Sequence, residues 1–525
     1  MVSSIRTIAL LGSAALGFAA PAARDQLTYT SQPERAAAVQ EAFDRAWNGY
    51  YTYAFPHDEL TPLTESYEDG FAGWGASAID AISTASIMGD KKVVNQILDY
   101  IPTIDFTKAN YTSSVSLFET TIRYLGGLLA AHDLLTGPAK DLVENPDSVA
   151  PILAQAVNLA DLLSVAFDTP TGIPINDLDW EPPRPQNDTT NGLATIGTLV
   201  LEWTRLSDLT GNTTYAELSQ KGEAYLLNPQ PKSIGEPFPG LLGSDVDVNN
   251  GSFVDSSGSW GGGTDSFYEY LIKMYLYDTD RFGAYKDRWV SAIDSSIKYM
   301  TSHPTSRPDL TFLAGWYNSS TLFYQSQHLA CFNGGNFILG GLTLDRQDYI
   351  DFGLELVAGC HDTYVETVTG IGPEIFNWQD SVLSANATNN SPPPANQTDF
   401  YQRAGYWIPD GGSAYILRPE VIESYYYAYR ATGDSKYQDW AWDAFLAINA
   451  TCSVGDIGFT AISNVNAPGG GEKYDEQESF FFAEVLKYSY MIQAEEAEWQ
   501  VSPDRDNTWV FNTEAHPFKI AGNAA

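Results

Sequence analysis

Basic side chains are scarce in this sequence, and their scarcity limits the partners that the protein can have. The 525 residues include 28 Lys or Arg against 66 Asp or Glu, which leaves a formal net charge of -38 and a pI near 4.2. Nucleic acids and anionic membranes attract positive charge, so neither is an expected partner. Disorder of the whole chain is excluded as well, because 44% of the residues are hydrophobic and only 18% are charged.

Cysteine and histidine are also few. No C-x-x-C pair occurs and the six histidines are scattered, which argues against a zinc site of any standard spacing. In an oxidising compartment, Cys331, Cys360 and Cys452 allow one disulfide and leave one free thiol. We expect Cys331 to pair with Cys360, a crosslink that would stabilise the fold by roughly 3–4 kcal/mol in the chain-entropy model.

The N-terminus has the pattern of a secretory signal peptide. Arg6 precedes a short apolar run at residues 8–20, and Ala20-Pro21-Ala22 follows as a cleavage site. The run is shorter than the ~20 residues of a spanning helix, and no later stretch qualifies. We therefore predict a signal peptide at 1–22, secretion, and no membrane insertion. Nine N-x-S/T triplets agree with a secreted, glycosylated chain; they begin at Asn110, Asn187, Asn212, Asn250, Asn318, Asn386, Asn389, Asn396 and Asn449.

Helical periodicity dominates the rest of the chain. Apolar side chains recur at helical intervals in the segments 118–129, 151–167, 199–209, 267–277, 288–300, 419–431, 436–448 and 478–492. Alternating strand patterns are few and short, and no fixed-period repeat indicates a solenoid. No composition break divides the chain. The sequence therefore predicts an N-terminal segment at 23–35, one α-helical domain at 36–517, and a C-terminal tail at 518–525.

Glu119 opens one of the expected helices, and its neighbours allow two interpretations. Ser116 before it is typical of a capping box, and Arg123 after it is typical of a surface ion pair. The alternative is a buried general acid. Gly126 and Gly127 each cost a helix roughly 1 kcal/mol, which signals close packing. Burial would then raise the pKa of a carboxyl towards the range of an acid catalyst.

A second acidic pair follows Pro419, which stands where a helix should begin. Glu420 then lies in the first turn, where the helix dipole favours the anionic form that a general base requires. Glu423, three residues later, shares its face. Ordinary acidic enrichment of a first helical turn is the alternative.

Two further carboxylates lie in unusual surroundings. Glu484 shares a helical stripe with Phe480 and Tyr488. A buried carboxylate without a partner is costly, so a polar cavity or a sugar site would resolve the conflict. Asp265 follows the glycine-rich loop 261–263 and precedes a helix, so it is either functional or only an N-cap. The loop lacks the spacing of a phosphate-binding motif.

Taken together, these motifs resemble glycoside hydrolase family 47, the class I α-1,2-mannosidases. The loop style and the expected cysteine pair look most like secreted fungal members. The matching blocks follow the family's order and comprise residues 57–60, 73–89, 116–129, 167–174, 263–273, 328–335, 372–374, 415–424, 478–488 and 512–517.

The resemblance implies an all-α fold, an (α/α)7 barrel in a single catalytic domain with minor short β hairpins. It also implies an inverting mechanism, in which the acid and base stand roughly 6.5–9.5 Å apart to admit a water molecule. Glu119 matches the proton donor and Glu420 the general base. Asp265 matches a third essential carboxylate, an acid or base partner, and Glu374 aligns with another acidic residue of the site.

A calcium ion (Ca2+) at the base of the barrel is the implied cofactor. Thr513 matches its direct ligand, and calcium accepts the 6–8 oxygen ligands that protein, water and sugar hydroxyls can supply together. The other implied positions are the carboxylates of the ion's water shell, Glu423, Glu484 and Glu514, and the sugar-contacting residues Arg123, His328, Arg418 and Phe480.

The chain departs from the family pattern at two places. Ser83 stands where the family repeats the aspartate of Asp80, and we expect local rearrangement there with catalysis retained. Gly263 stands where narrowly specific members of the endoplasmic reticulum carry arginine. The missing side chain should open the floor of the site to varied glycan branches.

These matches predict a secreted, calcium-dependent exo-α-1,2-mannosidase. Its expected substrate is a high-mannose oligosaccharide or N-glycoprotein, trimmed towards the five-mannose form, and we expect a monomer. The alternative is a non-catalytic protein that binds high-mannose glycans on the same fold. Such a protein would keep Phe480 and Thr513 and lose Glu119 or Glu420, whereas this chain carries all four.

Overall fold

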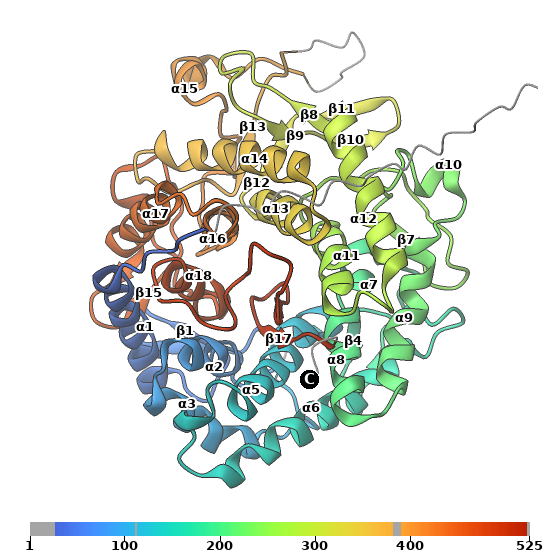
Figure 1. Cartoon of the computed structure of the whole chain (residues 1–525), viewed down its shortest axis with the longest axis vertical. Coiled ribbons are helices and arrows are strands. Elements are labelled where there is room, and N and C mark those ends of the chain that lie inside the picture. The colour runs from blue at the N-terminus through green and yellow to red at the C-terminus, as the bar shows by residue number, and fades with distance from the viewer. Residues whose placement is uncertain (1–26, 111–112, 382–389, 522–525) are drawn as a thin grey trace, which may run out of the picture.

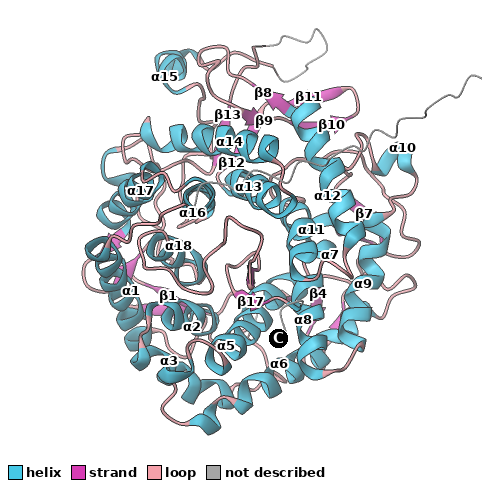
Figure 2. Ribbon diagram, viewed as in Figure 1, coloured by secondary structure: helices cyan, strands magenta, loops and turns pink. Residues whose placement is uncertain are grey.

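The computed structural model describes residues 27–110, 113–381 and 390–521. Helices dominate it, and they form two concentric rings (Figures 1 and 2). This is the predicted (α/α)7 arrangement, in which inner and outer helices alternate along the chain. The predicted signal peptide and the sequons at Asn386 and Asn389 lie outside the described residues.

In the described residues the inner ring consists of α2 (Ala76–Met88), α5 (Gly126–Thr136), α8 (Val200–Thr210), α11 (Asp265–Tyr277), α13 (Phe332–Leu344), α16 (Glu420–Thr432) and α18 (Leu486–Met491). The outer ring consists of α1 (Pro33–Tyr53), α3 (Lys91–Tyr100), α6 (Ala150–Leu163), α9 (Thr214–Leu227), α12 (Gly283–Ser295), α14 (Gln347–Val365) and α17 (Lys436–Cys452). Each predicted helical segment lies on one of these helices or on a short turn that joins it.

The side chains explain which helices lie inside. Every residue of α2 is buried, and its sequence is mostly alanine, serine, threonine and isoleucine. In α3, only Val93, Val94, Ile97 and Leu98 are buried, all on one face. A helix that is apolar or small on all sides must be surrounded, whereas an amphipathic helix covers a core with one face. Gly127 allows α5 to approach α2, since a Cβ there would lie 2.6 Å from Ile79 Cγ2.

Short helices and hairpins connect the rings. The remaining α-helices are α4 (Leu117–Thr120), α7 (Leu193–Gly197), α10 (Lys232–Gly235) and α15 (Thr398–Ala404). The paired strands are antiparallel: β1 (Glu59–Thr61) with β2 (Ser66–Glu68), β3 (Val115–Ser116) with β4 (Asp177–Asp179), β4 with β5 (Arg184–Pro185), β6 (Thr190–Gly192) with β7 (Asp245–Asp247), β8 (Thr301–Ser302) with β9 (Phe312–Leu313), β10 (Gly315–Asn318) with β11 (Thr321–Phe323), β12 (Gln325–Gln327) with β13 (Ile375–Asn377), β14 (Ser453–Val454) with β15 (Gly458–Phe459), and β16 (Trp509–Phe511) with β17 (Pro517–Lys519).

The C-terminal hairpin enters the middle of the inner ring (Figure 1). Its strand β16 contacts α11 and β17 contacts α5, so residues 512–516 at its tip lie inside the barrel. The predicted domain limits, 36 and 517, fall within α1 and β17. The segment predicted as a tail therefore begins inside a strand whose Phe518 is fully buried.

Two inner helices begin with a π-helical turn that the periodicity did not indicate. The turn η2 (Thr121–Leu125) joins α4 to α5, and η10 (Phe481–Val485) precedes α18. A π turn inserts an extra residue into the helical ladder and is common at functional sites. Arg123 and Glu484 lie in these two turns.

The cysteines are arranged as predicted. Cys331 and Cys360 form a disulfide that ties the start of α13 to α14, with their Cα atoms 6.0 Å apart. Cys452 is a buried free thiol, and burial raises its pKa to about 12. The thiol is therefore neutral at physiological pH.

One outer helix corrects an expectation from the sequence. The segment Pro146–Phe167 is long and apolar enough to cross a membrane, judged by length and composition alone. We had expected no stretch after residue 22 to qualify. In the fold, this segment contains α6, whose buried residues Ile152, Ala156 and Leu159 belong to the core next to α5.

Candidate active site

A cavity of about 170 Å³ lies where the N-termini of inner helices meet the C-terminal hairpin. Asp265 and Glu420 are the first residues of α11 and α16, and Thr513 comes from the hairpin. The predicted site residues that line the cavity are Glu119, Arg123, Asp265, Arg418, Glu420, Glu423, Phe480, Glu484, Thr513 and Glu514. His328 and Glu374 lie behind this lining and contact residues that belong to it. The fold thus gathers residues from distant parts of the chain into one acidic pocket.

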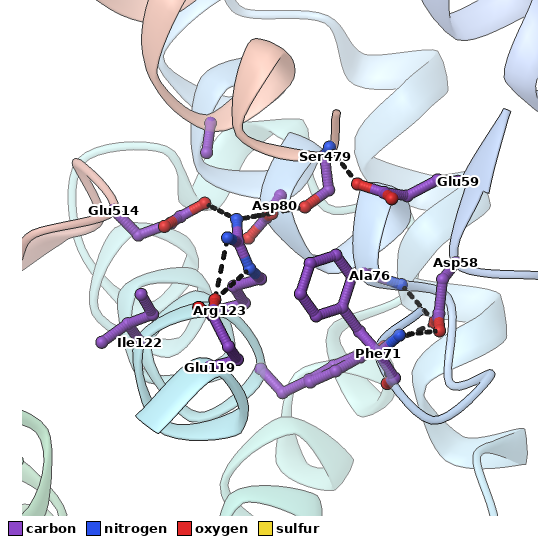
Figure 3. Close-up of polar contacts among 12 residues, drawn as sticks. Asp58, Glu59, Phe71, Ala76, Asp80, Glu119, Ile122, Arg123, Ser479 and Glu514 are labelled. Carbon is purple, nitrogen blue, oxygen red and sulfur yellow. Dashed lines mark hydrogen bonds and ion pairs between the residues drawn. The ribbon is translucent and has the colours of Figure 1, made fainter. Parts of the chain in front are cut away.

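Arg123 is the centre of a buried ion cluster (Figure 3). Its Nε and Nη2 lie 3.0 and 2.9 Å from Glu119 Oε2, and its Nη1 donates to Glu514. Asp80 Oδ2 lies 3.7 Å from Nη1. Although burial opposes the charge, these three carboxylates raise the pKa of Arg123 well above its ordinary value. The guanidinium therefore stays charged and orients Glu119 at the edge of the cavity.

The sequence allowed Glu119 to be part of a helix-capping box or of a surface ion pair, and the structure shows some contacts of each kind. Ser116 is the N-cap of α4, and its Oγ accepts a hydrogen bond from Glu119 N at 3.1 Å. The carboxylate, however, contacts Arg123, whose side chain is only 7% exposed. A surface ion pair is therefore the wrong description, because the guanidinium is buried among carboxylates.

Glu420 is held in a different environment. Its Oε2 accepts from His328 Nδ1 at 2.9 Å, and its Oε1 lies 3.7 Å from Arg418 Nη1. The Tyr364 hydroxyl lies 2.7 Å from His328 Nε2 and fixes the ring from behind. Burial favours the neutral acid, but the His328 hydrogen bond and the Arg418 charge outweigh it and hold the pKa of Glu420 below its ordinary value. Glu420 is therefore anionic, as a general base must be.

Glu374 acts on Arg418 rather than on the cavity itself. Its Oε2 accepts from Arg418 Nε at 2.7 Å, and its Oε1 accepts from Ile416 N at 3.3 Å. The guanidinium of Arg418 thus lies between Glu374 and Glu420. This arrangement fixes the position of Arg418 in the lining of the cavity.

The surroundings of Asp265 favour its protonated form, whereas those of Glu420 favour the ionised form. It is the first residue of α11, and the N-cap is Thr264, so Asp265 is not the cap. Its Oδ1 accepts from Ser266 N at 2.7 Å. Burial, with the nearby charges of Glu269 and Glu420, outweighs this hydrogen bond and raises the pKa of Asp265 to about 7. Two carboxyls of one cavity are thereby pushed towards opposite protonation states, a feature of acid–base sites.

Further carboxylates line the same cavity as Thr513. Burial raises the pKa of Glu423 to about 8. Burial, followed by the like charges of Glu514 and Glu423, raises the pKa of Glu484 well above its ordinary value. Glu269 joins this group and was missed in the sequence. Its i,i+4 spacing from both Asp265 and Lys273 on α11 was a usable signal, since Lys273 donates to it in the structure.

This donor set fits a hard cation. The candidate ligands that line the cavity together with Thr513 are all oxygens, and clustered buried carboxylates repel one another unless a positive charge lies among them. Among the described residues, no three His, Cys, Asp or Glu side chains converge closely enough to hold a metal directly. Thr513 could hold such an ion directly, and Glu423, Glu484 and Glu514, which line the same cavity, could accept hydrogen bonds from its water molecules.

Asn512 closes the hairpin tip on itself. Its Oδ1 accepts from the backbone N–H groups of Glu514 and His516 at 2.9 and 2.8 Å, and its Nδ2 donates to Ile122 O at 3.0 Å. A Cβ on Gly126 would lie 2.6 Å from that Nδ2, so glycine is required for this approach. The hairpin and the turn that carries Arg123 are thus held together.

Ser83 takes part in a buried relay on the other side of the hairpin. Its Oγ lies 2.9 Å from His516 Nδ1, and His516 Nε2 lies 3.2 Å from Asp80 Oδ1. Burial lowers the pKa of His516 to about 4, so the ring is neutral. It donates from Nε2 to Asp80 and accepts at Nδ1 from the Ser83 hydroxyl. A hydroxyl donor thus occupies the position where the sequence resemblance implies a second aspartate, and the contacts continue from Asp80 to Arg123.

Comparison with known proteins agrees with this geometry. The model of glycosyl hydrolase family 47 matches residues 42–520. Mannosyl-oligosaccharide alpha-1,2-mannosidase 1B of Aspergillus phoenicis is 56% identical over 521 residues, which cover 97% of this chain and 98% of that protein. The mannosyl-oligosaccharide alpha-1,2-mannosidase of Penicillium citrinum is 56% identical over 523 residues, 99% of this chain and 98% of that one.

A solved structure agrees as well. The alpha-1,2-mannosidase from Trichoderma reesei superimposes with a TM-score of 0.90 at 52% identity, covering 94% of this chain and 100% of that chain. The protein therefore belongs to glycosyl hydrolase family 47.

Proposed function

We propose that this protein is a secreted, calcium-dependent, inverting exo-α-1,2-mannosidase that trims high-mannose oligosaccharides. One observation carries the proposal: in a single cavity, Glu420 is held anionic while burial keeps Asp265 largely protonated below about pH 7. The names of the relatives, mannosyl-oligosaccharide alpha-1,2-mannosidases, support the substrate class. The N-terminal signal pattern supports secretion, and we expect a monomer.

The proposed chemistry divides between opposed carboxyls. Glu420, ionised beside His328, takes a proton from the attacking water. Glu119, oriented by Arg123, is the proposed proton donor to the glycosidic oxygen, with Asp265 as its protonated partner. Cleavage by one direct displacement inverts the configuration at the anomeric carbon.

The other lining residues would bind the sugar. Phe480 forms a wall of the cavity, and the Arg123 guanidinium carbon lies 5.5 Å from its ring centroid. Arg418 lines the cavity and lies between the carboxylates of Glu374 and Glu420. A calcium ion held by Thr513 would supply coordination for vicinal sugar hydroxyls and offset the charge of the surrounding glutamates.

Gly263 supports broad branch specificity. It has a φ of +89°, and no atom lies within 4 Å of the position that its Cβ would take. Gly263 lies two residues before Asp265, which lines the cavity, and glycine leaves the space at this position open. We propose that several α-1,2-linked mannoses are removed, towards the five-mannose form.

The test is incubation with a nine-mannose glycan, with and without a calcium chelator, followed by mass analysis of the products. We expect stepwise loss of mannose that stops when calcium is removed. Full activity after verified metal removal would overturn the calcium assignment, and a clean stop at eight mannoses would overturn the broad specificity. A non-catalytic glycan-binding protein, the alternative, would bind the glycan and release no mannose.

A further inference from the structure

An open hollow of about 480 Å³ lies where the segments that follow α1 and α3 meet the loop before α2. The helices α2 and α3 are neighbours in the two rings (Figure 1). The hollow shares no lining residue with the catalytic cavity. It is therefore a separate feature of the molecule, and the proposed chemistry does not use it.

Rings and aliphatic groups make up most of the lining of this hollow, namely Pro56, Ala72, Trp74, Tyr100, Ile104 and Ala109. The lining also contains one ammonium group, on Lys108, and one carboxylate, on Asp105, which lie 3.2 Å apart. Because these two charges neutralise each other, the hollow offers an ionic ligand little. Aromatic surface with polar edges suits a neutral ligand that has apolar faces, such as a sugar ring.

Asn110 belongs to the lining and begins one of the N-x-S/T triplets, whose other two residues lie outside the described residues. It is exposed, yet its position is fixed. Its Nδ2 donates to Asp69 Oδ2 at 2.8 Å, and its backbone N donates to Ala72 O at 2.9 Å. A Cβ on Gly73 would lie 3.2 Å from Asn110 Cβ, so the loop before α2 approaches the asparagine closely.

Asp69 holds the Asn110 amide in this position. The Asp69 side chain is only 6% exposed. His57 Nδ1 lies 2.9 Å from its Oδ2, and Asp58 N donates to its Oδ1 at 3.2 Å. An asparagine Nδ2 carries two hydrogens, and attachment of a glycan replaces one of them. The remaining N–H can keep its bond to Asp69, so the contact seen in the structure is compatible with a glycosylated side chain.

We propose that Asn110 carries an N-linked glycan whose first N-acetylglucosamine packs in this hollow. The proposal rests on the secretion that forms part of the proposed function. In the transfer, a bond forms between Nδ2 and the anomeric carbon of the sugar, and one amide proton leaves. The bond from that carbon to a lipid-linked pyrophosphate breaks, and the pyrophosphate is the leaving group.

The hollow has room for this sugar. Its volume of about 480 Å³ exceeds the roughly 170 Å³ of the catalytic cavity, for which a single hexose is proposed. The packed sugar covers apolar surface that is otherwise open to water, and it joins the segment after α3 to the loop before α2.

The test measures how fast peptide-N-glycosidase releases the glycan from the native secreted protein, with mass spectrometry of the peptides over time. Asn250 is the matched control, because it is also exposed and its Nδ2 also donates to an aspartate, Asp247 Oδ2 at 3.0 Å, but it lies outside the hollow. Release at Asn110 should be at least about tenfold slower than at Asn250, since the packed sugar must first leave the hollow. In the denatured protein the two rates should be equal. Should Asn250 carry no glycan, the exposed Asn212 takes its place.

A pair of variants separates the glycan from the asparagine that bears it. Thr112→Ala and Ser252→Ala each remove one acceptor triplet and keep the asparagine with its contact to aspartate. The thermal midpoint should fall by roughly 1–2 °C in Thr112→Ala and stay unchanged in Ser252→Ala.

An unmodified Asn110 in the secreted protein would overturn this proposal. A native release rate at Asn110 equal to that of the control, or a midpoint that falls equally in both variants, would overturn it as well. Retention of the wild-type chain inside the cell would instead overturn the secretion in the proposed function, and this proposal with it.

Discussion

Replacing Arg123 with methionine should destabilise the protein more than any other loss of a single charge discussed here. The change keeps an unbranched apolar side chain and removes the guanidinium that contacts Glu119, Glu514 and Asp80. The side chains of Glu514 and Asp80 are 4% and 0% exposed, so water cannot replace the lost partner. The variant therefore leaves buried carboxylates without their cation.

The size of the effect follows from this burial. Removing one partner of a buried ion pair costs about 3–5 kcal/mol. An unfolding entropy of about 2 cal/mol/K per residue means that, for a chain of this length, the free energy of unfolding changes by roughly 1 kcal/mol per degree near the thermal midpoint. The thermal midpoint should therefore fall by about 3–5 °C. Turnover should fall as well, because Glu119 loses both of its contacts with Arg123.

Differential scanning calorimetry checks the prediction, with Arg281→Met as the control. Arg281 also contacts two carboxylates, Asp208 and Asp278, but its side chain is 40% exposed. Exposed pairs contribute about 0–1 kcal/mol, so this midpoint should move by about 1 °C or less. Equal shifts in both variants would refute the reasoning from burial.

The pH dependence of stability gives a second check on the Arg123→Met variant. Arg123 lowers the pKa of Glu514, although burial holds that pKa well above its ordinary value. Without Arg123 the pKa rises further, so folding of the variant takes up protons. The stability difference between wild type and variant should therefore be larger at alkaline pH and shrink as the pH falls. A difference that grows on acidification would contradict the charge-based explanation.

Three other predictions follow from the site. Glu420→Gln should lower kcat by about 10²–10⁴-fold. In the wild type, kcat/KM should fall below pH 4.5 as Glu420 protonates and above about pH 7 as Asp265 ionises. A pH profile of kcat/KM that stays flat would contradict both assignments. Calcium at 100 times its Kd should stabilise the metal-free protein by about 2.7 kcal/mol in calorimetry, and no shift would argue against the cation site. Ser83→Ala should cost about 1–3 kcal/mol in denaturant unfolding by leaving His516 Nδ1 without a donor, whereas Ser77→Ala, which removes an unpartnered hydroxyl from the same helix, should be nearly neutral.

The helices were predictable because local side-chain patterns decide them. The spacing of apolar residues indicated α8, α11, α16 and α17 within a few residues of their observed ends. Pro419 marked the start of α16, where it is the N-cap. The π turns η2 and η10 were not predictable in this way, since an extra residue in the ladder is stabilised by packing around it rather than by a local motif.

The residue types of the site were also readable, whereas their surroundings were not. Glu119, Asp265 and Glu420 stood out in sequence, and the first-turn position of Glu420 favoured its ionised form. Nothing local indicated that Asp265 would favour the protonated form. That difference arises from burial of Asp265 and from His328 and Arg418 beside Glu420.

The amino-acid sequence by itself determined the helical character, the family and the set of candidate carboxylates, because each of these depends on residues close together in the chain. Tertiary structure alone decided which carboxylates share Arg123 and how Ser83 reaches His516. These features depend on the distances and dielectric surroundings of side chains hundreds of residues apart. Such distances are set when the two rings of helices close around the C-terminal hairpin.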